Sequence, residues 1–414
     1  MEYSDERKLF IDKLSETGVQ HPGCNSFYHG RIFKNPPPPP KVSWGSTLPP
    51  RNKESPTWLT ASEFNDSDKV LEEKAEYLVK LLKCSRKTVV YSGAGISTSS
   101  GVKQAARGHT GRTKGWGTKT EAKPSTTHLT LAALVNKGLV QEWVQQNHDG
   151  LPQKAGCPQE VLNEIHGSWF DPSNPVVKYS GSLRADLFER MEVSAETADL
   201  TIVLGTSLSG LCSDMVAEKT SERSLNSKSL GIVIINLQQT LMDGSATLRI
   251  FSETDRLMKI LTEMLDIKYK TPDYPDKVTT HALIPYDQEG ELSKTVLTCL
   301  DLTPCSRIKL NANHNCQGAM QPPKLHIGAS EPFKHKGKVK QPGNGVGRVV
   351  GFCTRQRGWK LEVDGVPMLL GSWWIEDAVQ GGPQTIPIIN ITTNVQQRGK
   401  EGEEYRLKCR CKQQ

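Results

Sequence analysis

Four short apolar runs, each followed at once by small or polar residues, constrain the fold of this 414-residue chain more than any other feature. Near-continuous apolar runs of this length are typical of parallel strands that helices cover on both faces. Segments with helical spacing separate the runs, and this alternation indicates an open α/β sheet. The sequence therefore predicts a Rossmann-like parallel sheet with helices on both faces. The runs are residues 87–91, 139–146, 200–204 and 232–235, and the residues that follow them are 92–97, 147–150, 205–208 and 236–238.

Two of the separating segments carry clear helix signals. Apolar residues recur at helical spacing over residues 70–82, and Asp66 or Ser67 is the expected N-cap. A second helix is predicted over residues 128–137, with Gly138 as its C-terminal stop.

The first apolar run leads into a glycine turn, Ser92-Gly-Ala-Gly-Ile-Ser97. Glycines let a backbone approach a pyrophosphate, and free N–H groups at the start of a helix can donate to it. The third glycine of the usual fingerprint is absent, so on this motif alone an ordinary tight turn remains an alternative. Ligands of open α/β sheets bind at the carboxyl ends of the strands. All four strand ends carry side chains suited to ribose and phosphate, and together they predict a nucleotide site.

Six motifs follow one another over roughly residues 66–266: Gly93-Ala-Gly-Ile-Ser-Thr98, Arg107-Gly108, Gln146-Asn-His-Asp-Gly-Leu151, Glu164-Ile-His-Gly167, Gly205-Thr-Ser-Leu208 and Ile235-Asn236. In this order they resemble the sirtuins, a family of NAD-dependent protein deacylases. The resemblance covers about half of the chain. Finer details at residues 122–128, 156–158 and 236–240 are most similar to the nuclear, class IV branch.

The resemblance implies a reaction and a set of site residues. Sirtuins break the bond between nicotinamide and ribose in NAD, and an acyl-lysine oxygen attacks the exposed ribose carbon. His166 matches the general base that takes a proton from a ribose hydroxyl, which suits histidine because its unperturbed pKa lies near neutral pH; a buried core histidine is the alternative. Asn147 and Asp149 match the pair that holds the nicotinamide ribose and a water. NAD contacts are implied for Gly93, Ala94, Gly95, Thr98, Arg107, Gln146, Asn147, Gly205, Thr206, Ser207, Asn236 and Gln238.

Three departures from the family pattern bear on activity. Residues 102–106 lack the acid and the aromatic that members carry in the loop over nicotinamide. His148 stands where the family has a small apolar residue, and it would perturb the acyl channel or add a second titrating group. Thirteen residues, none of them cysteine, separate Gly167 from Gly181, where the family carries a structural zinc module. We therefore predict a reduced small lobe, a retained NAD-binding half and no metal ligands in this segment.

Three hypotheses about function remain open. The first is a deacylase that transfers the acyl group of an acylated protein lysine, such as a histone lysine, to ADP-ribose and releases nicotinamide. The second is a zinc-free NAD hydrolase or ADP-ribosyltransferase, in which water or another acceptor replaces the acyl-lysine. The third is a catalytically weak NAD-binding scaffold. The retained His166, Asn147 and Asp149 favour the catalytic hypotheses, and the reduced lobe favours the second and third.

The rest of the chain divides around the predicted NAD-binding domain, residues 66–266. Residues 1–65 contain five consecutive prolines, and we predict an extended arm that links or binds a proline-recognising partner. Residues 267–343 are predicted to be a linker. Residues 344–414 are predicted to be a small β-rich module with a basic tail, in which Asp364-Gly365 is a hairpin turn. The adjacent Trp373 and Trp374 are expected on a strand, one side chain inward and one outward.

Net charge, cysteine spacing and hydropathy bear on the possible partners, metal sites and location of the protein. The net charge of +7 is modest, and the basic cluster at residues 334–340 is interpreted as a solvated loop, with nuclear targeting or DNA contact as the alternative. No C-x-x-C pair occurs; Cys299, Cys305, His314 and Cys316 lie within one short segment and could converge on a metal. No apolar stretch approaches the ~20 residues that cross a bilayer, and the polar N-terminus does not support a signal peptide. We expect an intracellular protein, in the nucleus rather than the cytoplasm.

Overall fold

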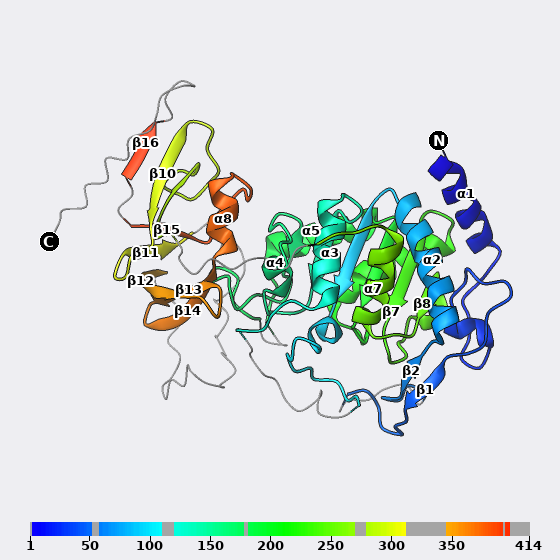
Figure 1. Cartoon of the computed structure of the whole chain (residues 1–414). Helices are drawn as coiled ribbons and strands as arrows, with labels where there is room; N and C mark the ends of the chain where they lie inside the picture. Colours follow the sequence, from blue (N-terminus) through cyan, green and yellow to red (C-terminus); the bar gives the residue numbers. More distant parts are fainter. Residues whose placement is uncertain are drawn as a thin grey trace.

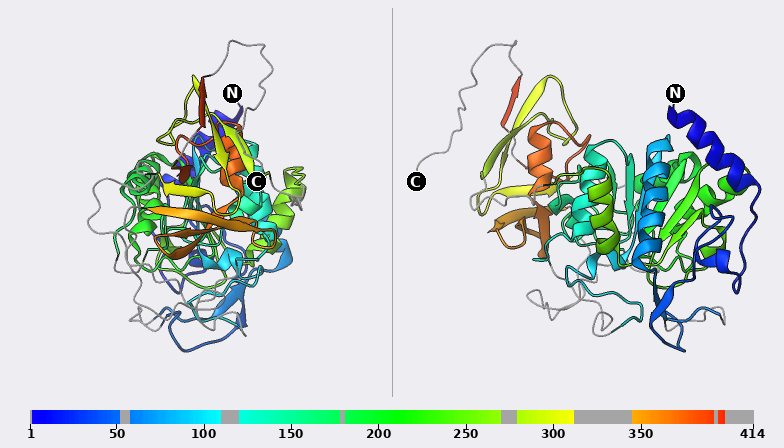
Figure 2. Two further views of the ribbon diagram at one scale, coloured as in Figure 1. Left: turned by 90° about the vertical axis from the view of Figure 1, so that its left-hand side faces the viewer. Right: turned by 45° about the vertical axis from the view of Figure 1, so that its right-hand side comes forward.

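Two lobes lie side by side in the computed structural model of the chain (Figure 1), which describes residues 2–51, 58–109, 120–177, 181–269, 279–311, 345–391 and 394–397. The larger lobe contains a parallel sheet between two layers of helices. The smaller lobe is built from antiparallel strands and one helix. Figure 2 shows the same two lobes from two further directions.

A six-stranded parallel sheet forms the centre of the larger lobe, as the apolar runs predict. Its strand order is β5-β4-β3-β6-β7-β8, and its pairings are parallel throughout. Strands β3, β6 and β7 are buried along their whole length because helices cover both faces. The bounds are β3 Thr88–Ser92, β4 Glu142–Gln145, β5 Leu162–Asn163, β6 Leu200–Leu204, β7 Gly231–Ile235 and β8 Leu248–Ile250.

Two groups of helices sandwich this sheet. Helices α2, α3 and α7 share one core cluster, which includes Leu78, Leu131 and Leu257. Helices α5 and α6 pack on the opposite face, where Met191 and Val216 belong to a second cluster. The predicted α/β class is therefore confirmed. The bounds are α2 Asp68–Cys84, α3 Thr126–Asn136, α4 Leu151–Lys154, α5 Ala185–Thr197, α6 Met215–Leu225 and α7 Thr254–Met264, with short 3-10 helices η1 Asn25–Tyr28, η2 Ala94–Ser97, η3 Cys212–Asp214 and η4 Asp243–Ser245.

Helix α2 begins after Ser67, and the preceding Asp66 has a different role from the predicted cap. Asp66 forms a fully buried ion pair with Lys74, at 2.8 Å between Oδ2 and Nζ. The same carboxylate accepts the backbone N–H of Phe251 at 2.9 Å, which ties the start of α2 to the end of β8. Burial lowers the pKa of Lys74 to about 8, with Asp66 opposing the shift.

The prediction that residues 1–65 form an extended arm is wrong for their first part. Residues Glu2–Ser15 form helix α1, which contacts α2 and α6. Leu14 is 1% exposed, and Arg7 pairs with Asp199 at 2.6 Å across 192 residues. The helix contributes only scattered apolar residues, so its sequence lacks the regular periodicity by which a buried helix is recognised.

The segment after α1 also joins the main core. Phe27 is 2% exposed and Ile32 is fully buried, although prolines follow closely at 36–40. Backbone hydrogen bonds from Arg31 and Ile32 to Ala246 and Thr247 attach this segment beside β8. Further on, a two-stranded antiparallel sheet is formed by β1 Lys41–Trp44 and β2 Glu63–Asn65.

The smaller lobe is a β-rich module, as predicted, but it begins earlier than residue 344. Strands β9, β10 and β11 lie inside the predicted linker and pair with later strands, so the linker prediction is wrong for residues 281–310. The sheet orders are β16-β10-β9 and β14-β13-β12-β11-β15. The bounds are β9 His281–Ile284, β10 Val296–Asp301, β11 Arg307–Leu310, β12 Val346–Cys353, β13 Gly358–Val363, β14 Val366–Gly371, α8 Trp373–Val379, β15 Ile388–Asn390 and β16 Asn394–Gln397.

Two local predictions in this module have opposite outcomes. Asp364 and Gly365 form the turn between β13 and β14, both with positive φ (49° and 77°), as the hairpin signal predicts. The prediction for the two tryptophans is wrong. Trp373 and Trp374 begin helix α8 rather than lying on a strand, and both side chains are buried, at 4 and 3% exposed.

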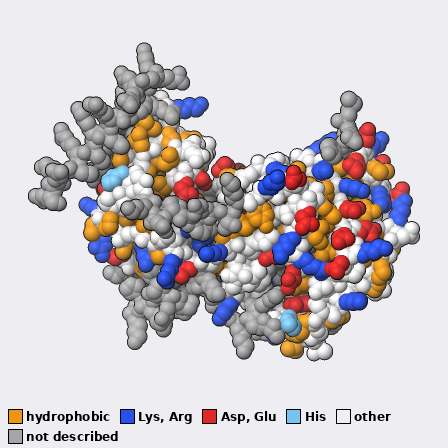
Figure 3. Space-filling model, in the orientation of Figure 1, with side chains coloured by type: hydrophobic (Ala, Val, Ile, Leu, Met, Phe, Trp, Pro, Cys, Tyr) orange, Lys and Arg blue, Asp and Glu red, His pale blue; other side chains and the backbone are white. Residues whose placement is uncertain are grey.

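Two further features of the described residues are the hydropathy of their helices and the charge on one face of the surface. Among the described residues, no helix is both long and apolar enough to cross a membrane. On the face in Figure 3, acidic and basic side chains are intermixed over the larger lobe. The basic cluster at residues 334–340 lies outside the described residues.

We predict that helix α1 contributes to global stability. Leu14→Ala should lower the free energy of unfolding by about 2–5 kcal/mol, because a buried leucine leaves a cavity. Leu9, which is 67% exposed on the same helix, is the matched control, and Leu9→Ala should change stability by less than about 0.5 kcal/mol. Urea denaturation of both variants measures the difference. Equal, small effects would show that α1 does not belong to the folded core.

Candidate active site

The glycine turns after β3 and β6 meet in close backbone contact. The N–H of Gly95 donates to the carbonyl of Gly205 at 2.8 Å, and Gly205 has a φ of 58°. A Cβ on Gly95 would lie 2.6 Å from the Gly205 Cα, so neither position has room for a side chain. The turn after β3 continues as a four-residue 3-10 helix, Ala94–Ser97, and not as the longer helix that the phosphate-loop interpretation expects. These glycines therefore permit the close packing of two strand ends.

A buried polar network links the turn after β3 to the end of β4. Asp149 is 1% exposed and accepts the Ser97 hydroxyl at 2.6 Å through Oδ2. Asn147 donates from Nδ2 to Ser97 Oγ and to the Gly93 carbonyl, each at 3.0 Å. The backbone N–H of Leu151 completes the network by donating to Asp149 Oδ1 at 3.1 Å. Because its amide nitrogen is committed, Asn147 keeps its side-chain carbonyl oxygen as the available acceptor.

A second network runs beside the first and reaches His166. Tyr91, fully buried in β3, donates to Asp214 Oδ1 and lies 2.7 Å from Ser213 Oγ. Gln146 donates from Nε2 to the same tyrosine hydroxyl. Ser213 Oγ lies 3.4 Å from His166 Nε2. The network thus joins the ends of β3 and β4 to η3 and to the segment that carries His166.

The histidines at 148 and 166 are both held in the neutral form. Burial and, to a smaller extent, the nearby His148 together lower the pKa of His166 to about 4. Burial also lowers the pKa of His148. His148 Nδ1 lies 2.8 Å from the carbonyl oxygen of Gly167, which can only accept. Nδ1 therefore carries the hydrogen, and Nε2 is left with its lone pair.

The resemblance implies that Arg107 contacts NAD with the phosphate loop and Gln238 on the adenosine side, and both side chains contact the N-terminal segment. Arg107 donates from Nη1 to the carbonyls of Pro49 and Arg51, at 2.6 and 3.0 Å. Gln238 donates from Nε2 to the Ala61 carbonyl at 3.0 Å and to the backbone of Arg107. The N-terminal segment therefore forms one wall of this part of the site.

The remaining predicted contacts lie in the turns between these groups. Thr98 donates to the Gly95 carbonyl at 3.0 Å, and Ala94 is half-buried in η2. Thr206 accepts from Gln146 Nε2 at 3.1 Å. Ser207 donates to Ser209, and Asn236 donates to the Gln238 carbonyl. All the predicted site residues thus lie in the loops at the carboxyl ends of β3, β4, β6 and β7 or in the segments that pack on them.

Several residues that build this site escape sequence reasoning. Ser97 lies within a recognised motif but shows its role only through its contacts with Asn147 and Asp149. Tyr91 could have been suspected, because a buried tyrosine hydroxyl usually finds a partner. Ser213 and Asp214 follow the matched motif at 205–208 and carry no pattern of their own.

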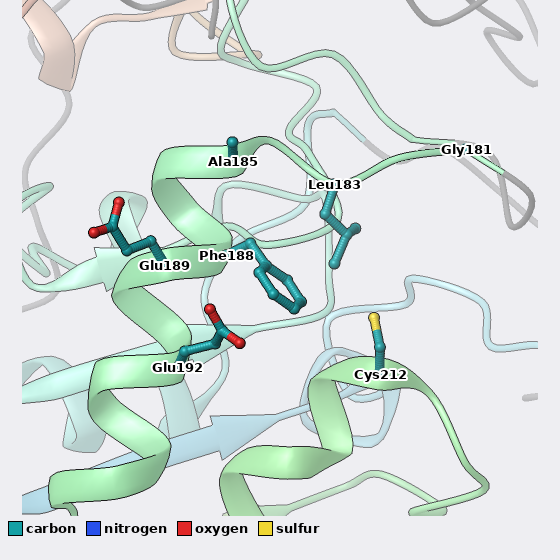
Figure 4. A pocket seen from close by; sticks show the side chains of 7 residues that line it. All are labelled: Gly181, Leu183, Ala185, Phe188, Glu189, Glu192 and Cys212. Carbon is teal, nitrogen blue, oxygen red and sulfur yellow. The ribbon is translucent and has the colours of Figure 1, made fainter. Parts of the chain in front are cut away.

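An open hollow of about 690 Å³ lies between α5 and η3, with Cys212 of η3 in its lining (Figure 4). Leu183 and Phe188 supply apolar lining, Glu189 and Glu192 carry carboxylates, and Cys212 closes the opposite side. Residues 185–194 belong to helix α5. The resemblance implies a strand near this position that pairs with the peptide substrate, and no such strand is recognisable in the sequence of these residues.

Glu164, two residues before His166, is a buried acid without full hydrogen bonding. Its side chain is 3% exposed, and its Oε1 has no partner among the described residues. Burial and, to a smaller extent, the negative charge of Asp171 together raise the pKa of Glu164 to about 8. The carboxyl group is therefore largely protonated near neutral pH.

Among the described residues, no three His, Cys, Asp or Glu side chains are grouped as metal ligands. Cys299 and Cys305 are described, but His314 and Cys316 of the candidate group lie outside the described residues.

Comparison with known proteins finds relatives that are named NAD-dependent protein deacetylases. No model of a protein family matches the chain. The NAD-dependent protein deacetylase Sirt6 of Drosophila melanogaster is 30% identical over 271 residues, which cover 53% of this chain and 83% of that protein. The NAD-dependent protein deacetylase SRT1 of Arabidopsis thaliana is 29% identical, over 50% of this chain and 52% of that protein. The NAD-dependent protein deacetylase sirtuin-7 of Bos taurus is 26% identical, over 50% of this chain and 63% of that protein.

Solved structures also match the chain. One is a structure of Sir2 with a p53 peptide and NAD+, with 24% sequence identity and a TM-score of 0.40. The match covers 47% of this chain and 99% of that chain.

We predict that Glu164→Gln stabilises the protein more at high pH than at low pH. A folded-state pKa above the ordinary 4.5 means that Glu164 stabilises the fold fully below pH 4.5 and loses this contribution as the pH rises to about 8. The amide cannot ionise, so the gain should reach about 1–3 kcal/mol at pH 8 and vanish near pH 4.5. The exposed Glu189 is the control. Thermal melts of both Gln variants at pH 5 and 8 test this; a pH-independent effect of Glu164→Gln would contradict it.

Proposed function

This chain belongs to the sirtuin family, and from that membership we propose that it is an NAD-dependent protein deacylase. It would transfer an acyl group from a protein lysine to ADP-ribose and release nicotinamide. The single observation that supports this activity best is the convergence of His166, Asn147 and Asp149 at the ends of β3 and β4. These residues come from separate parts of the sequence. Asn147 and His166 each keep a polar atom available to a ligand, and Asp149 fixes the Ser97 hydroxyl group that holds Asn147.

The residues present fit the nicotinamide-ribose half of NAD. The carbonyl oxygen of Asn147 remains an acceptor for a ribose hydroxyl or a water, because its amide donates to Ser97 and Gly93. Gln146 is fixed by Tyr91 and Thr206 at the edge of the same group. The adenosine half would lie toward Asn236 and Gln238, where the N-terminal segment accepts a hydrogen bond from Gln238 through the Ala61 carbonyl.

The proposed chemistry divides between NAD and the chain. When bound, NAD supplies a ribose carbon from which nicotinamide can leave. His166 takes a proton from a ribose hydroxyl, and its neutral state at physiological pH makes it ready to accept one. Asn147 and Asp149 orient the ribose and a water. Because Ser213 contacts His166 and is itself held by Tyr91, the imidazole has a fixed neighbour on its Nε2 side.

The acyl-lysine peptide would use the hollow between α5 and η3. Leu183 and Phe188 can contact the aliphatic part of a side chain, and Glu189 and Glu192 favour a peptide with further basic residues. A lysine-rich histone segment has this chemistry. The hollow is lined by Cys212, which directly precedes Ser213 in η3, and Ser213 contacts His166.

A second candidate function, NAD hydrolysis, is favoured by His148. Its Nδ1 hydrogen is committed to Gly167, which leaves a neutral Nε2 lone pair on the residue that stands between Asn147 and Asp149 in the chain. This lone pair can accept a hydrogen bond from a water. A water held there would compete with the acyl oxygen for the ribose carbon, and NAD would then be consumed without deacylation.

Nuclear location and a proline-recognising partner complete the proposal. The nucleus is supported by the likeness of residues 122–128 and 236–240 to the nuclear, class IV branch. Of the proline run at 36–40, Pro38 and Pro39 are exposed, so a proline-recognising domain could reach them. Cell fractionation and pull-down with residues 30–45 as a peptide test these two points separately.

We predict that His166→Ala abolishes nicotinamide release but not NAD binding. Loss of a general base typically costs about 10² to 10⁴ in rate, whereas most of the proposed NAD contacts lie on other residues. NAD should therefore still raise the melting temperature of the variant. Nicotinamide is measured by chromatography with NAD and an acetylated peptide. Full activity of the variant would place the chemistry elsewhere, and no release by the wild type with any acyl peptide would favour the scaffold hypothesis.

We predict that His148→Val changes the partition between deacylation and hydrolysis. Valine has no lone pair to hold a water, so the ratio of deacylated peptide to free ADP-ribose should rise. The NAD-induced melting shift should change little, because the His148 ring is bonded to Gly167 and is not one of the proposed NAD contacts. Mass spectrometry of the products with and without acyl peptide measures the ratio. An unchanged ratio would show that His148 does not take part in the hydrolytic route.

A further inference from the structure

We propose that the C-terminal β module braces the active site, with Trp373 as the positioning residue that holds loop 147–150 and segment 166–170 in register. The module is defined by its described residues, 279–311, 345–391 and 394–397. The proposal goes beyond the proposed function, because the brace can exist whether or not the site is catalytic.

The first contact in this brace is Phe170, which belongs to the module's core although it lies 111 positions before residue 281. Its side chain is fully buried in the cluster formed by the module's strands and α8. The Phe170 and Trp373 ring centroids are 5.1 Å apart. The backbone N–H of Gly371, at the end of β14, donates to the Phe170 carbonyl at 3.0 Å. The segment after His166 is thus held by both its side chain and its backbone.

The second contact is at Gly150, the residue that follows Asp149. Gly150 has a φ of 62°, and a Cβ there would lie 2.8 Å from the Phe170 ring and 3.0 Å from the Trp373 ring. Both rings therefore fill the space beside this glycine. Because a tightly packed backbone can move only if its neighbours move, Trp373 limits the positions open to Asp149.

The third contact joins the two site segments to each other. The N–H of Trp169 donates to the His148 carbonyl at 2.9 Å. In return, His148 Nδ1 donates to the Gly167 carbonyl at 2.8 Å. These reciprocal bonds stitch loop 147–150 to segment 166–170 directly beside the Phe170 and Trp373 pair, so a shift at Phe170 would be transmitted to both.

Polar contacts join the module to the α/β domain beside this apolar contact. The N–H of Gln159 donates to Asp377 of α8 at 3.4 Å, and Gln356 donates to Thr120 at 3.0 Å. Lys154 of α4 lies 4.7 Å from the Phe170 ring centroid and donates to the Thr120 carbonyl. These polar contacts therefore join the module to the α/β domain beside the apolar centre.

The brace supports the short segment between Gly167 and Gly181, which has no metal ligands of the cysteine type. Only thirteen residues separate Gly167 from Gly181, and none can serve as a thiolate ligand that would fix the segment through a metal. Its described residues, 168–177, form no helix or strand, and the two-residue strand β5 lies shortly before them. Packing against the module supplies the order that the segment cannot generate alone.

The two adjacent tryptophans provide a matched experiment in the full chain. Both indoles are buried in the same cluster, and Trp373 is the one whose ring pairs with Phe170. Trp373→Leu and Trp374→Leu should therefore lower the melting temperature to a similar extent. Only Trp373→Leu should speed amide hydrogen exchange in residues 147–151 and 166–170, by about tenfold or more, while strands β3 and β6 keep their protection.

The kinetic arm rests on the proposed function and separates positioning from general stability. Trp373→Leu should lower kcat for nicotinamide release by about 10²-fold, as a small misplacement of catalytic groups can do, and leave the Kd for NAD unchanged. Trp374→Leu should keep kcat. Trp373→Phe, which retains an aromatic ring against Phe170, should recover most of the lost rate.

Gly150→Ala is the second variant, because it removes no side chain from the module's core. Its new methyl group must displace the Phe170 or Trp373 ring, so exchange in residues 147–151 should also rise. The brace is overturned if exchange in these residues is the same in both tryptophan variants, or if Gly150→Ala leaves it unchanged. If the wild type releases no nicotinamide, the proposed function fails, and the exchange results alone decide whether the brace exists.

Discussion

The parallel pairing of β3 with β4 and β6 is the constraint on which the rest of the structure depends. Parallel strands end at one edge of a sheet, so Ser92 lies opposite Gln145 and Leu204, and the following turns must share one small space. That space admits two backbones only where no side chain intervenes, which is why Gly95 and Gly205 face each other. Once these turns are in contact, Ser97 can bridge Asn147 and Asp149, and Tyr91 can reach Gln146 and η3.

The two ends of the chain complete this sheet in different ways. The N-terminal segment packs beside β8 and accepts hydrogen bonds from Arg107 and Gln238, so it forms a wall at the predicted adenosine side. The C-terminal module packs beneath loop 147–150 through Phe170 and Trp373. The α/β domain is therefore supported on both sides of its site by segments outside residues 66–266.

The sequence predicts the sheet because buried parallel strands leave a local trace. The run at 200–204 coincides with β6, and the run at 232–235 lies within β7. Local signals also locate α2, α3 and the Asp364-Gly365 turn. The run at 139–146 overestimates β4, since Gln146 already leaves the sheet to contact Tyr91 and Thr206.

What the sequence does not reveal depends on long-range contacts. Leu14 and Phe27 are isolated apolar residues among polar ones and prolines, and only tertiary packing shows that they are core. Strands β9 to β11 were hidden in a lysine- and proline-rich region because their partners lie as far away as β15 and β16. The two tryptophans were assigned to a strand because nothing in Trp373-Trp374 signals the start of a helix. The motif residues of the site could be located through a family resemblance, whereas Ser213 and Asp214 could not.

The stoichiometry of one turnover tests the central claim most directly. Wild-type protein is incubated with NAD and an acetylated lysine-rich peptide, and nicotinamide, deacetylated peptide and the ADP-ribose product are quantified together. The account predicts that nicotinamide appears in step with deacetylated peptide and with acetylated ADP-ribose, and any excess nicotinamide is matched by free ADP-ribose. Deacetylated peptide without nicotinamide, or the absence of both products from protein whose melting temperature does not respond to NAD, would contradict it.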